Sequence, residues 1–444
     1  GMAGAFGGLG LGNGLGGGLD TLYRGTEAGA GGLELYGPEQ LNLLNKTLNI
    51  ARNSKFYKSK LQDFPLELKN ILDLQNFPFT TKKELRDCYP FGALAVPIND
   101  VVELHTSSGT TGKAALSYLT KEDLKNSSKA IAKAWKCFGI THSSRVQFMM
   151  SYGLFSGATL NTYAIQELGG FVVPAGIQSA GKQIQMMLDF KIDTVVGTVG
   201  YYFYLLDYIK EKQIPLERFS LKRGIMAGEI YSDKVRAKVE RKFKIKIFDH
   251  YGLCEVNTGI AYECEFRTGL HFLDNYVLAE IINPEDGKVL PTDNEGELVL
   301  TTLKKKASPL IRYRTGDITS IKSGKCPCGR SSIRIDRIKR RVDDLIFIKG
   351  VKVDPYELKE CLFEIAGDNI FSDIKIRVGS SFENYRPEML VSLKNPSNTN
   401  LLLVIQKALK EKTLLTFDVK HISRDYFQRE ENTKVKFVEY GNKK

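Results

Sequence analysis

Short apolar runs alternate with amphipathic stretches through the middle of the chain, from about residue 101 to residue 252. The apolar runs have strand length and are rich in Val, Ile and Phe, so we expect strands at 146–150, 171–173, 194–196 and 245–248. Between them, helical spacing of apolar residues predicts helices at 121–138, 182–190, 201–212 and 232–243. This alternation indicates an α/β fold with a mostly parallel sheet covered on both faces. Ligands of such sheets bind beyond the carboxyl ends of the strands.

The pattern changes on either side of this region. Residues 1–34 are rich in glycine, and we expect a flexible N-terminal segment there, before helical spacing begins at 41–51. Residues 270–338 favour strands and predict a small β-barrel, and helices are expected again at 356–365 and 401–411. We therefore predict a large N-terminal domain over 35–340, with a β region at 260–340, and a small mobile α+β domain over 341–444.

Composition limits the kind of partner. The 444 residues are 42% hydrophobic and 26% charged, as in an ordinary globular protein, with a net charge of +12. That charge permits nucleic acid, a membrane surface or any polyanion, but no arginine-rich helix or aromatic-basic motif favours nucleic acid. We expect a phosphorylated cofactor such as ATP or coenzyme A, and a homodimer is compatible with the sequence. Without an apolar run of about 18 residues or a charged leader, we expect a cytoplasmic protein that does not bind membranes.

The most informative motif follows the apolar run at 101–105. Its hydroxyl, glycine and lysine residues are Thr106, Ser107, Ser108, Gly109, Thr110, Thr111, Gly112 and Lys113. Glycine lets the backbone approach phosphate oxygens closely, and hydroxyls, N–H groups and the lysine donate to them. It is not a Walker loop, because Ser107 stands at the first glycine position and Ala114 follows the lysine. The alternative is an ordinary Ser/Thr/Gly-rich surface loop.

Four further residues have the chemistry of a structural metal site. They form a Cys-x6-His pair and a Cys-x-Cys pair: Cys264, His271, Cys326 and Cys328. Four N and S ligands suit tetrahedral Zn²⁺ with no open position, so such a site would be structural. The alternative is a set of scattered free thiols. We expect the remaining cysteines at 88, 137 and 361 to be packing residues.

Several motifs in fixed order resemble those of adenylate-forming enzymes, the superfamily of acyl-CoA synthetases, peptide-synthetase adenylation domains and luciferases. They are the stretch at 106–113, Ala227-Gly228-Glu229, the segment 249–255, Tyr313 to Asp317, Arg341 to Asp344, and Lys434. Finer features are similar to the phenylacetate-CoA ligase branch, namely 78–86, 89–92 and the cysteine knuckle 326–330. The resemblance covers the chain from about residue 35 onward.

This resemblance implies roles for individual residues. ATP, Mg²⁺ and coenzyme A become the expected cofactors, with Lys113, Glu255 and Lys434 as catalytic residues. Tyr251 would pack on adenine, Glu255 would hold Mg²⁺, and Asp317 would accept the ribose hydroxyls beside Arg341. The other expected nucleotide-binding residues are the loop 107–112, Gly228, Glu229, Asp249 and Gly252.

Ordinary alternatives stand beside these roles. Asp317 could be a turn residue, Arg341 a solvated cation, and Lys434 one of the alternating lysines of a strand face. Thr433 also replaces the glycine usual before that lysine. The acid pocket would involve Tyr152, Gly153, Phe155 and Ala227, although Phe155 could equally pack in the core. Asp343 is the expected hinge of the small domain, with a solvated acidic pair as the alternative.

The sequence thus predicts an AMP-forming ligase that activates an aromatic or arylacetic acid as its acyl-adenylate and transfers it to coenzyme A. Two other functions stay open at this point. The enzyme could pass the acyl group to a carrier protein or an amine, or the chain could be a scaffold that binds nucleotide without turnover.

Overall fold

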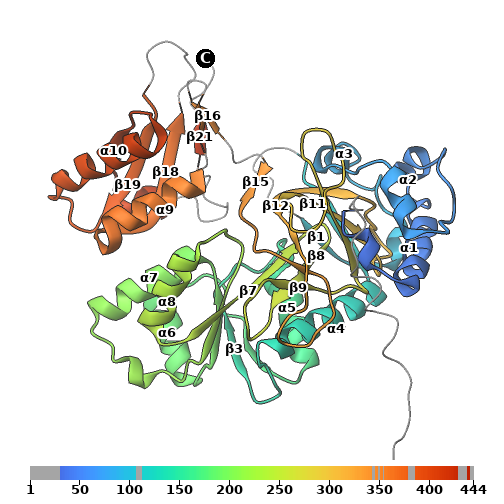
Figure 1. Ribbon diagram of the computed structural model, residues 1–444. Coiled ribbons are helices and arrows are strands. Elements are labelled where there is room, and N and C mark those ends of the chain that lie inside the picture. Colours follow the sequence, from blue (N-terminus) through green and yellow to red (C-terminus); the bar gives the residue numbers. More distant parts are fainter. Residues whose placement is uncertain are drawn as a thin grey trace, which may run out of the picture.

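The computed structural model describes residues 31–106, 113–342, 346–348, 351–353, 355–378, 386–428 and 438–440. Figure 1 shows a large body and, beside its green helices, a smaller body coloured orange to red. The smaller body contains the residues described after 346. Among the described residues, no helix is both long and apolar enough to cross a membrane.

A mixed sheet forms the centre of the large body. In the described part of the chain it has nine strands, in the order β13-β14-β9-β8-β7-β6-β5-β3-β4. These are β3 (Arg145–Phe148), β4 (Phe171–Val173), β5 (Thr194–Gly197), β6 (Arg223–Met226), β7 (Lys246–Leu253), β8 (Asn257–Glu263), β9 (Leu270–Phe272), β13 (Ile321–Lys322) and β14 (Arg334–Ile335). Strands β4, β3, β5, β6 and β7 are parallel, and the other pairings are antiparallel. The α/β sheet is confirmed, but only the strands β3 to β7 are parallel.

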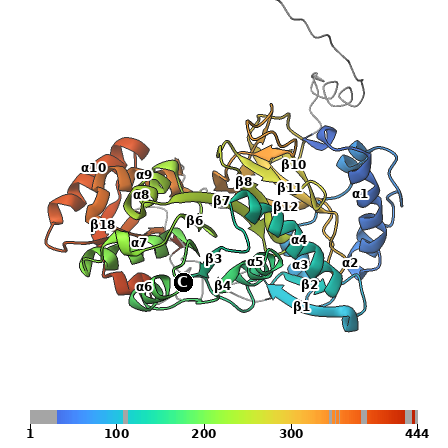
Figure 2. The same cartoon turned by 90° about the horizontal axis from the view of Figure 1, so that it is seen from below.

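Helices cover both faces of the sheet, as predicted. They are α4 (Lys121–Cys137), α5 (Ser156–Glu167), α6 (Ala180–Asp189), α7 (Val199–Glu211) and α8 (Asp233–Phe243). Adjacent strand residues point to opposite layers: Val196 lies in one core cluster with Trp135 of α4, and Val195 lies in another with Tyr202 of α7. Figure 2 shows α4 and α5 on one side of β6 and β7, with α7 and α8 on the other.

Helix α5 and the short helices α2 (Lys55–Lys60), α3 (Lys82–Asp87) and α11 (Arg424–Gln428) have no counterpart among the predicted elements. The buried residues of α5 include Ser156 and Thr162 as well as apolar ones, so the apolar positions alone give no clear helical period. Even Asn161 is buried, where its side chain accepts from Trp135 Nε1 at 2.7 Å and donates to the Gly157 carbonyl at 2.7 Å. Only the tertiary packing shows how a polar side chain is accommodated at that position.

The strand before the phosphate-binding motif does not join the large sheet, contrary to our expectation. β1 (Val101–Thr106) pairs antiparallel with β2 (Leu116–Thr120) in a two-stranded unit, with Thr106 opposite Leu116. The Thr106 N–H donates to the Leu154 carbonyl at 2.9 Å. This bond holds the end of β1 beside the segment that follows β3.

The expected small β-barrel is, among the described strands, an open four-stranded antiparallel sheet in the order β10-β11-β12-β15. Its strands are β10 (Val277–Ile282), β11 (Gly296–Thr302), β12 (Tyr313–Thr319) and β15 (Arg340–Arg341). The cysteine knuckle lies outside it, between β13 and β14 of the large sheet. We expected strand residues from Leu310, but β12 begins at Tyr313 because Arg312 has a left-handed φ of 46°.

The packed structure begins earlier than the predicted boundary at residue 34. Leu33 is fully buried, and the Gly31 carbonyl accepts from the Ile281 N–H at 2.9 Å. The expected flexibility of residues 1–30 lies outside the described residues. Three α-helices follow, namely α1 (Pro38–Ala51), α2 (Lys55–Lys60) and α3 (Lys82–Asp87). Short 3-10 turns occur at Leu33–Leu35, Ile71–Asn76, Ile98–Asp100, Leu216–Arg218 and Gly367–Asn369.

The smaller body has the predicted α+β character. Its described sheet has the order β20-β19-β18-β21, and a hairpin of β16 and β17 precedes it. The elements are β16 (Ile346–Ile348), β17 (Val351–Val353), α9 (Pro355–Ala366), β18 (Ile370–Val378), β19 (Glu388–Leu393), α10 (Thr399–Thr413), β20 (Asp418–His421), α11 (Arg424–Gln428) and β21 (Val438–Tyr440). Helices α9 and α10 and strands β18 and β19 share one hydrophobic core.

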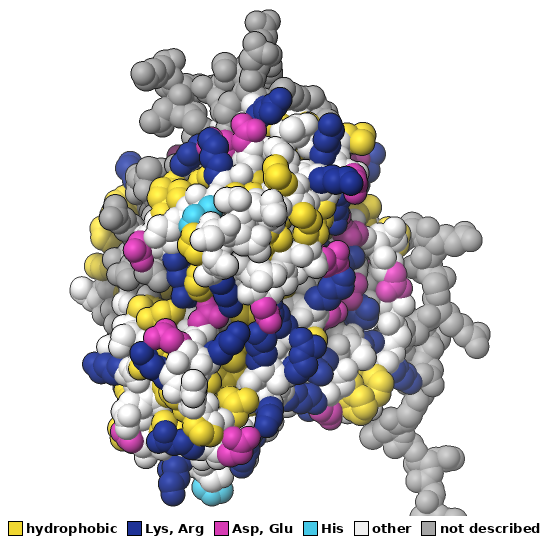
Figure 3. Space-filling model, turned by 90° about the vertical axis from the view of Figure 1, so that its left-hand side faces the viewer, with side chains coloured by type: hydrophobic (Ala, Val, Ile, Leu, Met, Phe, Trp, Pro, Cys, Tyr) yellow, Lys and Arg dark blue, Asp and Glu magenta, His cyan; other side chains and the backbone are white. Residues whose placement is uncertain are grey.

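Charged side chains connect the two bodies. Asp368 of the small body lies 2.6 Å from the amine of Lys238 and 3.1 Å from that of Lys242, both on α8. In the opposite sense, Lys394 of the small body lies 2.7 Å from Asp207 on α7. Figure 3 views the molecule from the left-hand side of Figure 1 and shows many Lys and Arg side chains on that face. The contacts are exposed ion pairs, which individually contribute little stability.

Candidate active site

Three predicted nucleotide-binding residues from different strands meet in one cluster. Tyr251 of β7 donates its hydroxyl to Asp317 of β12 at 2.6 Å, and Arg341 of β15 donates to the other carboxylate oxygen at 2.7 Å. Asp317 and Arg341 are direct partners in the β12–β15 pairing. The cluster therefore joins the large sheet to the four-stranded sheet. Asp317 is not merely a turn residue, and Arg341 is not merely a solvated cation.

Burial controls the charge state of this cluster. Tyr251 and Asp317 are buried, and the carboxylate side chain is only 5% exposed. Burial, reinforced by the neighbouring Asp317 charge, raises the pKa of Tyr251 well above its ordinary value. The phenol therefore stays protonated and donates its hydrogen bond. The result is a carboxylate of fixed orientation, whose oxygens accept hydrogen bonds.

Glu255 is a buried carboxylate in the turn between β7 and β8. Its side chain is 4% exposed, and its Oε1 lies 3.0 Å from the amine of Lys82 at the start of α3. Carboxylate oxygens are the hard ligands that Mg²⁺ takes in proteins. The residue expected to hold Mg²⁺ thus fits that role.

Lys305 brings a second buried amine to the same turn. Its Nζ donates to the Glu255 carbonyl oxygen at 2.6 Å and to Ser117 Oγ of β2 at 2.6 Å. Burial lowers the pKa of Lys305 to about 8, while the charge of Asp123 and that of Glu255 oppose the decrease. Lys305 therefore remains mostly protonated at neutral pH.

Asp249 lies outside the Tyr251–Asp317–Arg341 cluster. Its carboxylate accepts from Arg337 Nε at 2.7 Å, and its N–H donates to Glu263 at 2.8 Å. Arg337 also contacts Asp233 and the Tyr231 carbonyl. Asp249 thus belongs to an ion-pair network that joins β7 to α8.

Glycine is needed at positions 228 and 252 for two different physical reasons. Gly228, just after β6, has a φ of 79°, a conformation that other residues rarely adopt, and Glu229 beside it is exposed. Gly252 has no such φ, but a Cβ there would lie 2.3 Å from the Thr258 carbonyl carbon. Gly252 is therefore required by the close approach of β8.

The predicted acid-pocket residues come from the ends of β3 and β6, the two strands that flank β5 in the sheet. Tyr152, Gly153 and Phe155 lie between β3 and α5, and Ala227 follows β6. Ala227 and Tyr251 belong to one hydrophobic cluster, and Tyr152 packs against it. The Tyr152 hydroxyl shares a hydrogen bond with Thr162 at 2.8 Å. Phe155 is half-buried at the start of α5, so core packing remains an alternative for it.

Several predicted site residues cannot be placed. Ser107, Ser108, Gly109, Thr110, Thr111 and Gly112, the hinge candidate Asp343 and the catalytic candidate Lys434 lie outside the described residues. Lys113, at the end of the phosphate-binding motif, is described and exposed. The roles of these residues stay predictions.

A cavity of about 670 Å³ lies close to the Gly228–Glu229 segment. Ile230 and Tyr231 form one wall, Arg337 and Ile338 another, and α9 of the small body contributes Lys359 and Phe363. The cavity thus opens between the two bodies. The cavity is lined by residues of both bodies.

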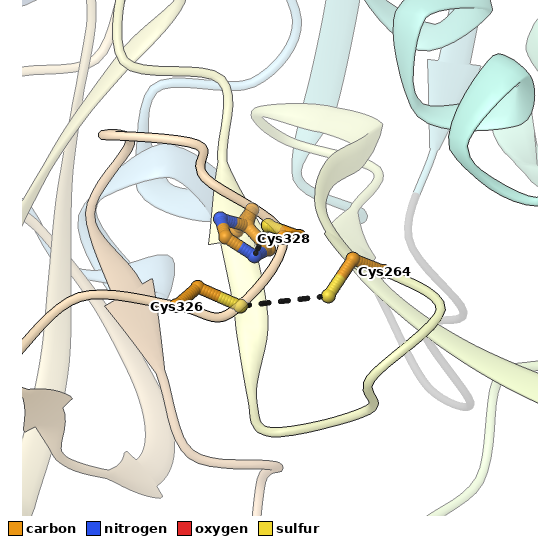
Figure 4. Close-up of side chains that lie close together, drawn as sticks. Cys264, Cys326 and Cys328 are labelled. Carbon is orange, nitrogen blue, oxygen red and sulfur yellow. Dashed lines mark hydrogen bonds between the residues drawn. The ribbon is translucent and has the colours of Figure 1, made fainter. Parts of the chain in front are cut away.

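The four predicted metal ligands converge. Their ligand atoms all lie within 4.8 Å of one another. Cys264 Sγ is 3.6 Å from Cys326 Sγ, and Cys328 Sγ is 3.4 Å from His271 Nε2. Figure 4 shows the labelled Cys264 and Cys326 with their sulfur atoms directed toward each other. All seven cysteines of the chain are free thiols, but these three are not scattered.

Two of the four ligands, His271 and Cys326, have pKa values suited to a metal, whereas burial raises the pKa of Cys264 to about 11, so that thiol would lose its proton on binding a cation. Burial, together with Arg334 and Arg330, lowers the pKa of His271 to about 4, so the imidazole is neutral at pH 7. Ser332 occupies His271 Nδ1 at 2.9 Å, which leaves Nε2 directed at the sulfurs. Burial acts against ionisation of Cys326, but hydrogen bonds from Thr268 and Cys328 lower its net pKa to about 7. The donor set therefore fits Zn²⁺.

Comparison with known proteins agrees with this site. Residues 48–303 match the family model described as AMP-binding enzyme. The chain belongs to this family. Phenylacetate-coenzyme A ligase of Aromatoleum evansii is 40% identical over 300 residues, which cover 67% of this chain and 68% of that protein. The Pseudomonas putida protein of the same name is 37% identical over 332 residues, covering 73% and 75%. These relatives place the chain in the phenylacetate-CoA ligase branch.

The fold is also similar to that of a solved CoA ligase structure. A crystal structure of a 2-hydroxyisobutyryl-CoA ligase, in the postadenylation state in complex with R3-HIB-AMP, superposes with a TM-score of 0.81. The two proteins are 20% identical, and the superposition covers 91% of this chain and 89% of that one. The two proteins thus share a fold that extends over both bodies.

Two residues of the site have no role in the sequence prediction. Lys82 belongs to a motif that we recognised only as a branch feature, and Lys305 lies in no motif at all. A lysine flanked by Lys304 and Lys306 looks like part of a solvated charge run. No sequence signal identifies it, because its burial depends on strands that are far away along the chain.

Proposed function

We propose that this chain is an AMP-forming ligase that activates an arylacetic acid with ATP and transfers the acyl group to the thiol of coenzyme A. The buried Tyr251–Asp317–Arg341 cluster, in a chain of the AMP-binding enzyme family, carries the proposal. The names of its relatives, phenylacetate-coenzyme A ligases, support the choice of acid and thiol.

The chemistry proceeds in two displacements. A carboxylate is a poor electrophile because its leaving group would be oxide. In the first step, a carboxylate oxygen of the acid attacks the α-phosphorus of ATP, and pyrophosphate leaves. In the second, the thiol sulfur attacks the acyl carbonyl carbon and loses its proton, and AMP leaves with the acid oxygen. The protein must hold the acid in line and balance the charge on the phosphates.

The residues of the cluster divide the nucleotide between them. Asp317 accepts the two ribose hydroxyls, since its carboxylate is held in one orientation by Tyr251 and Arg341. The ring of Tyr251 packs against adenine. Positions 106–113 grip the β- and γ-phosphates with hydroxyls, N–H groups and the Lys113 amine.

Glu255 would hold Mg²⁺, whose charge offsets that of the triphosphate. Support comes from the burial of this carboxylate and from its position 3.0 Å from the Lys82 amine. The Lys82 amine lies beside one oxygen of the Glu255 carboxylate and partly compensates its negative charge. The acid binds beside Ala227 and Tyr152, where small and aromatic side chains suit a flat apolar ring.

Lys434 completes the adenylating centre from the small body, and Asp343 is the hinge on which that body turns between the two steps. The two displacements need different groups at one place, and a lid on a short hinge can exchange them. The ion pairs described between the bodies, such as Asp368 with Lys238, are partly exposed and individually weak, which is compatible with such a movement.

Cys264, His271, Cys326 and Cys328 bind one structural Zn²⁺. The convergence of four N and S ligand atoms within 4.8 Å and the neutral His271 support this assignment. The ion would tie the turn after β8 to β9 and to the knuckle between β13 and β14. Its chemistry is that of a cross-link, with no open position for substrate.

Acid-dependent exchange of labelled pyrophosphate into ATP tests the proposal. We expect exchange with phenylacetate, loss of exchange in Glu255→Gln at an unchanged melting temperature, and thioester formation when coenzyme A is added. Lys306→Met, at a surface lysine paired with Glu122, is the control and should retain exchange. No exchange with any aryl acid would refute adenylation, and transfer only to a carrier protein or an amine would refute the choice of coenzyme A.

A further inference from the structure

Lys305 joins two segments that are distant in sequence and that both belong to the candidate site. Ser117, which accepts from its amine at 2.6 Å, lies on β2, four residues after Lys113. The Glu255 carbonyl, which accepts at 2.6 Å, belongs to the residue whose carboxylate faces Lys82. One amine thus links the strand that leaves the phosphate-binding motif to the turn that carries Glu255.

The position of this amine is costly. Lys305 is 2% exposed, and Ser117 and Glu255 are buried as well. An ammonium group that is buried loses its hydrogen bonds to water, and hydrogen bonds within the protein must replace them. A neutral side chain of similar length would avoid this desolvation free energy. Here both observed acceptors are neutral oxygens of the two site segments. The buried charge therefore contributes more to the arrangement of these segments than to stability.

Other contacts already fasten the loop that carries Lys305. The N–H groups of Lys306 and Ala307 donate to Asp123 at 2.7 and 3.0 Å. Ser308 exchanges hydrogen bonds with the backbone of Tyr118 on β2, at 3.1 and 3.2 Å. The loop backbone thus stays attached to β2 and α4 without the Lys305 side chain. What the side chain adds is the link to Glu255.

We propose that Lys305 is a positioning residue that fixes the spacing between β2, the strand that follows the phosphate-binding motif, and the Glu255 carboxylate. The proposal rests on the proposed function, in which that motif and Glu255 both bind MgATP. Since both segments act on the same triphosphate, a change in their spacing weakens nucleotide binding and slows adenylation. Binding of the aryl acid, which uses Ala227 and Tyr152, is unaffected.

The test compares four variants. Lys305→Met removes the amine at similar length, and Ser117→Ala removes one acceptor without touching the lysine. Ser117→Thr keeps the hydroxyl, and Lys306→Met is the matched control at the neighbouring, exposed lysine. MgATP binding is measured by calorimetry without acid, and pyrophosphate exchange gives kcat and the KM values for MgATP and acid. Thermal melting reports stability.

We expect Lys305→Met to weaken MgATP binding at least tenfold and Ser117→Ala about three- to tenfold, as for loss of charge-assisted hydrogen bonds. The acid KM should stay within twofold, and Ser117→Thr and Lys306→Met should resemble the wild type. Lower melting temperatures with MgATP binding unchanged in both Lys305→Met and Ser117→Ala would overturn the proposal.

Two further outcomes are also decisive. If Lys305→Met does not fold, the difference between Ser117→Ala and Ser117→Thr decides the question, because both retain the lysine. If the wild type shows no exchange, the proposed function fails, and calorimetry alone judges the role of Lys305. In that case equal MgATP affinity in the wild type and Ser117→Ala refutes it.

Discussion

Replacing Cys326 with serine should remove the zinc ion that we propose at the cluster of Cys264, His271, Cys326 and Cys328, which lies where three segments of the large sheet meet. In tetrahedral geometry, Zn–S bonds of about 2.3 Å and Zn–N bonds of about 2.0 Å place two sulfurs about 3.8 Å apart and sulfur and nitrogen about 3.5 Å apart. The observed separations are 3.6 Å for Cys264 and Cys326, and 3.4 Å for Cys328 and His271. These two separations are thus within about 0.2 Å of the spacing that the ion requires, and all four ligand atoms lie within 4.8 Å of one another.

The stability at stake follows from mass action. An ion that binds only the folded chain, at a free concentration about 1,000 times its dissociation constant, adds about 4 kcal/mol to the free energy of unfolding. Serine is a poor zinc ligand, so Cys326→Ser should lose most of this contribution. The loss should concentrate in the segments next to the cluster, which are β9 and the knuckle between β13 and β14.

Three measurements check this prediction. Elemental analysis should find about one zinc per chain in the wild type and in the control Cys88→Ser, whose sulfur contacts the Leu85 carbonyl outside the cluster. Cys326→Ser should contain much less zinc and melt at a lower temperature, and hydrogen exchange should speed up at 270–272. A chelator should reproduce these effects in the wild type. A wild-type protein that is free of zinc when purified in its presence, and whose melting a chelator does not change, would refute the reasoning.

Three other predictions follow from buried charges. Arg312 and Glu280 form an ion pair with side chains 3% and 1% exposed, so Arg312→Met should cost about 3–5 kcal/mol of unfolding free energy. Adding Glu280→Gln should recover part of that loss in denaturant titrations; further destabilisation would contradict the ion-pair explanation. Burial raises the pKa of Asp274 to about 7, so the folded protein loses stability as pH rises from about 4 to 7. Asp274→Asn should therefore raise the melting temperature at pH 8 and leave it nearly unchanged at pH 4; equal effects at both would disprove the shift. Asp317→Asn should raise the KM for ATP about tenfold or more with little change in the acid KM, and an unchanged ATP KM would exclude Asp317 from the ribose site.

Local sequence patterns determined much of the fold. Helical and strand periods identified α4, α6 to α8 and the parallel strands β3, β4, β5 and β7, because each of these elements buries one face or one short run of apolar residues. Ligand chemistry and spacing were enough to select Cys264, His271, Cys326 and Cys328, which the structure brings together. Motif resemblance likewise singled out Tyr251, Asp317 and Arg341 before any contact between them was known.

Only the tertiary structure decided which strands pair and which polar groups are buried. Strand β1 has the composition of a sheet strand, but it pairs with β2 alone, since register depends on partners distant in sequence. Helix α5 carries no clear period because its buried residues include Ser156, Asn161 and Thr162 as well as apolar ones. Lys305 lies between two other lysines and is still almost fully buried, held by Ser117 and Glu255 from segments about 190 and 50 residues away. Desolvation and hydrogen bonding act between residues that meet in space, and a one-dimensional pattern does not contain those distances.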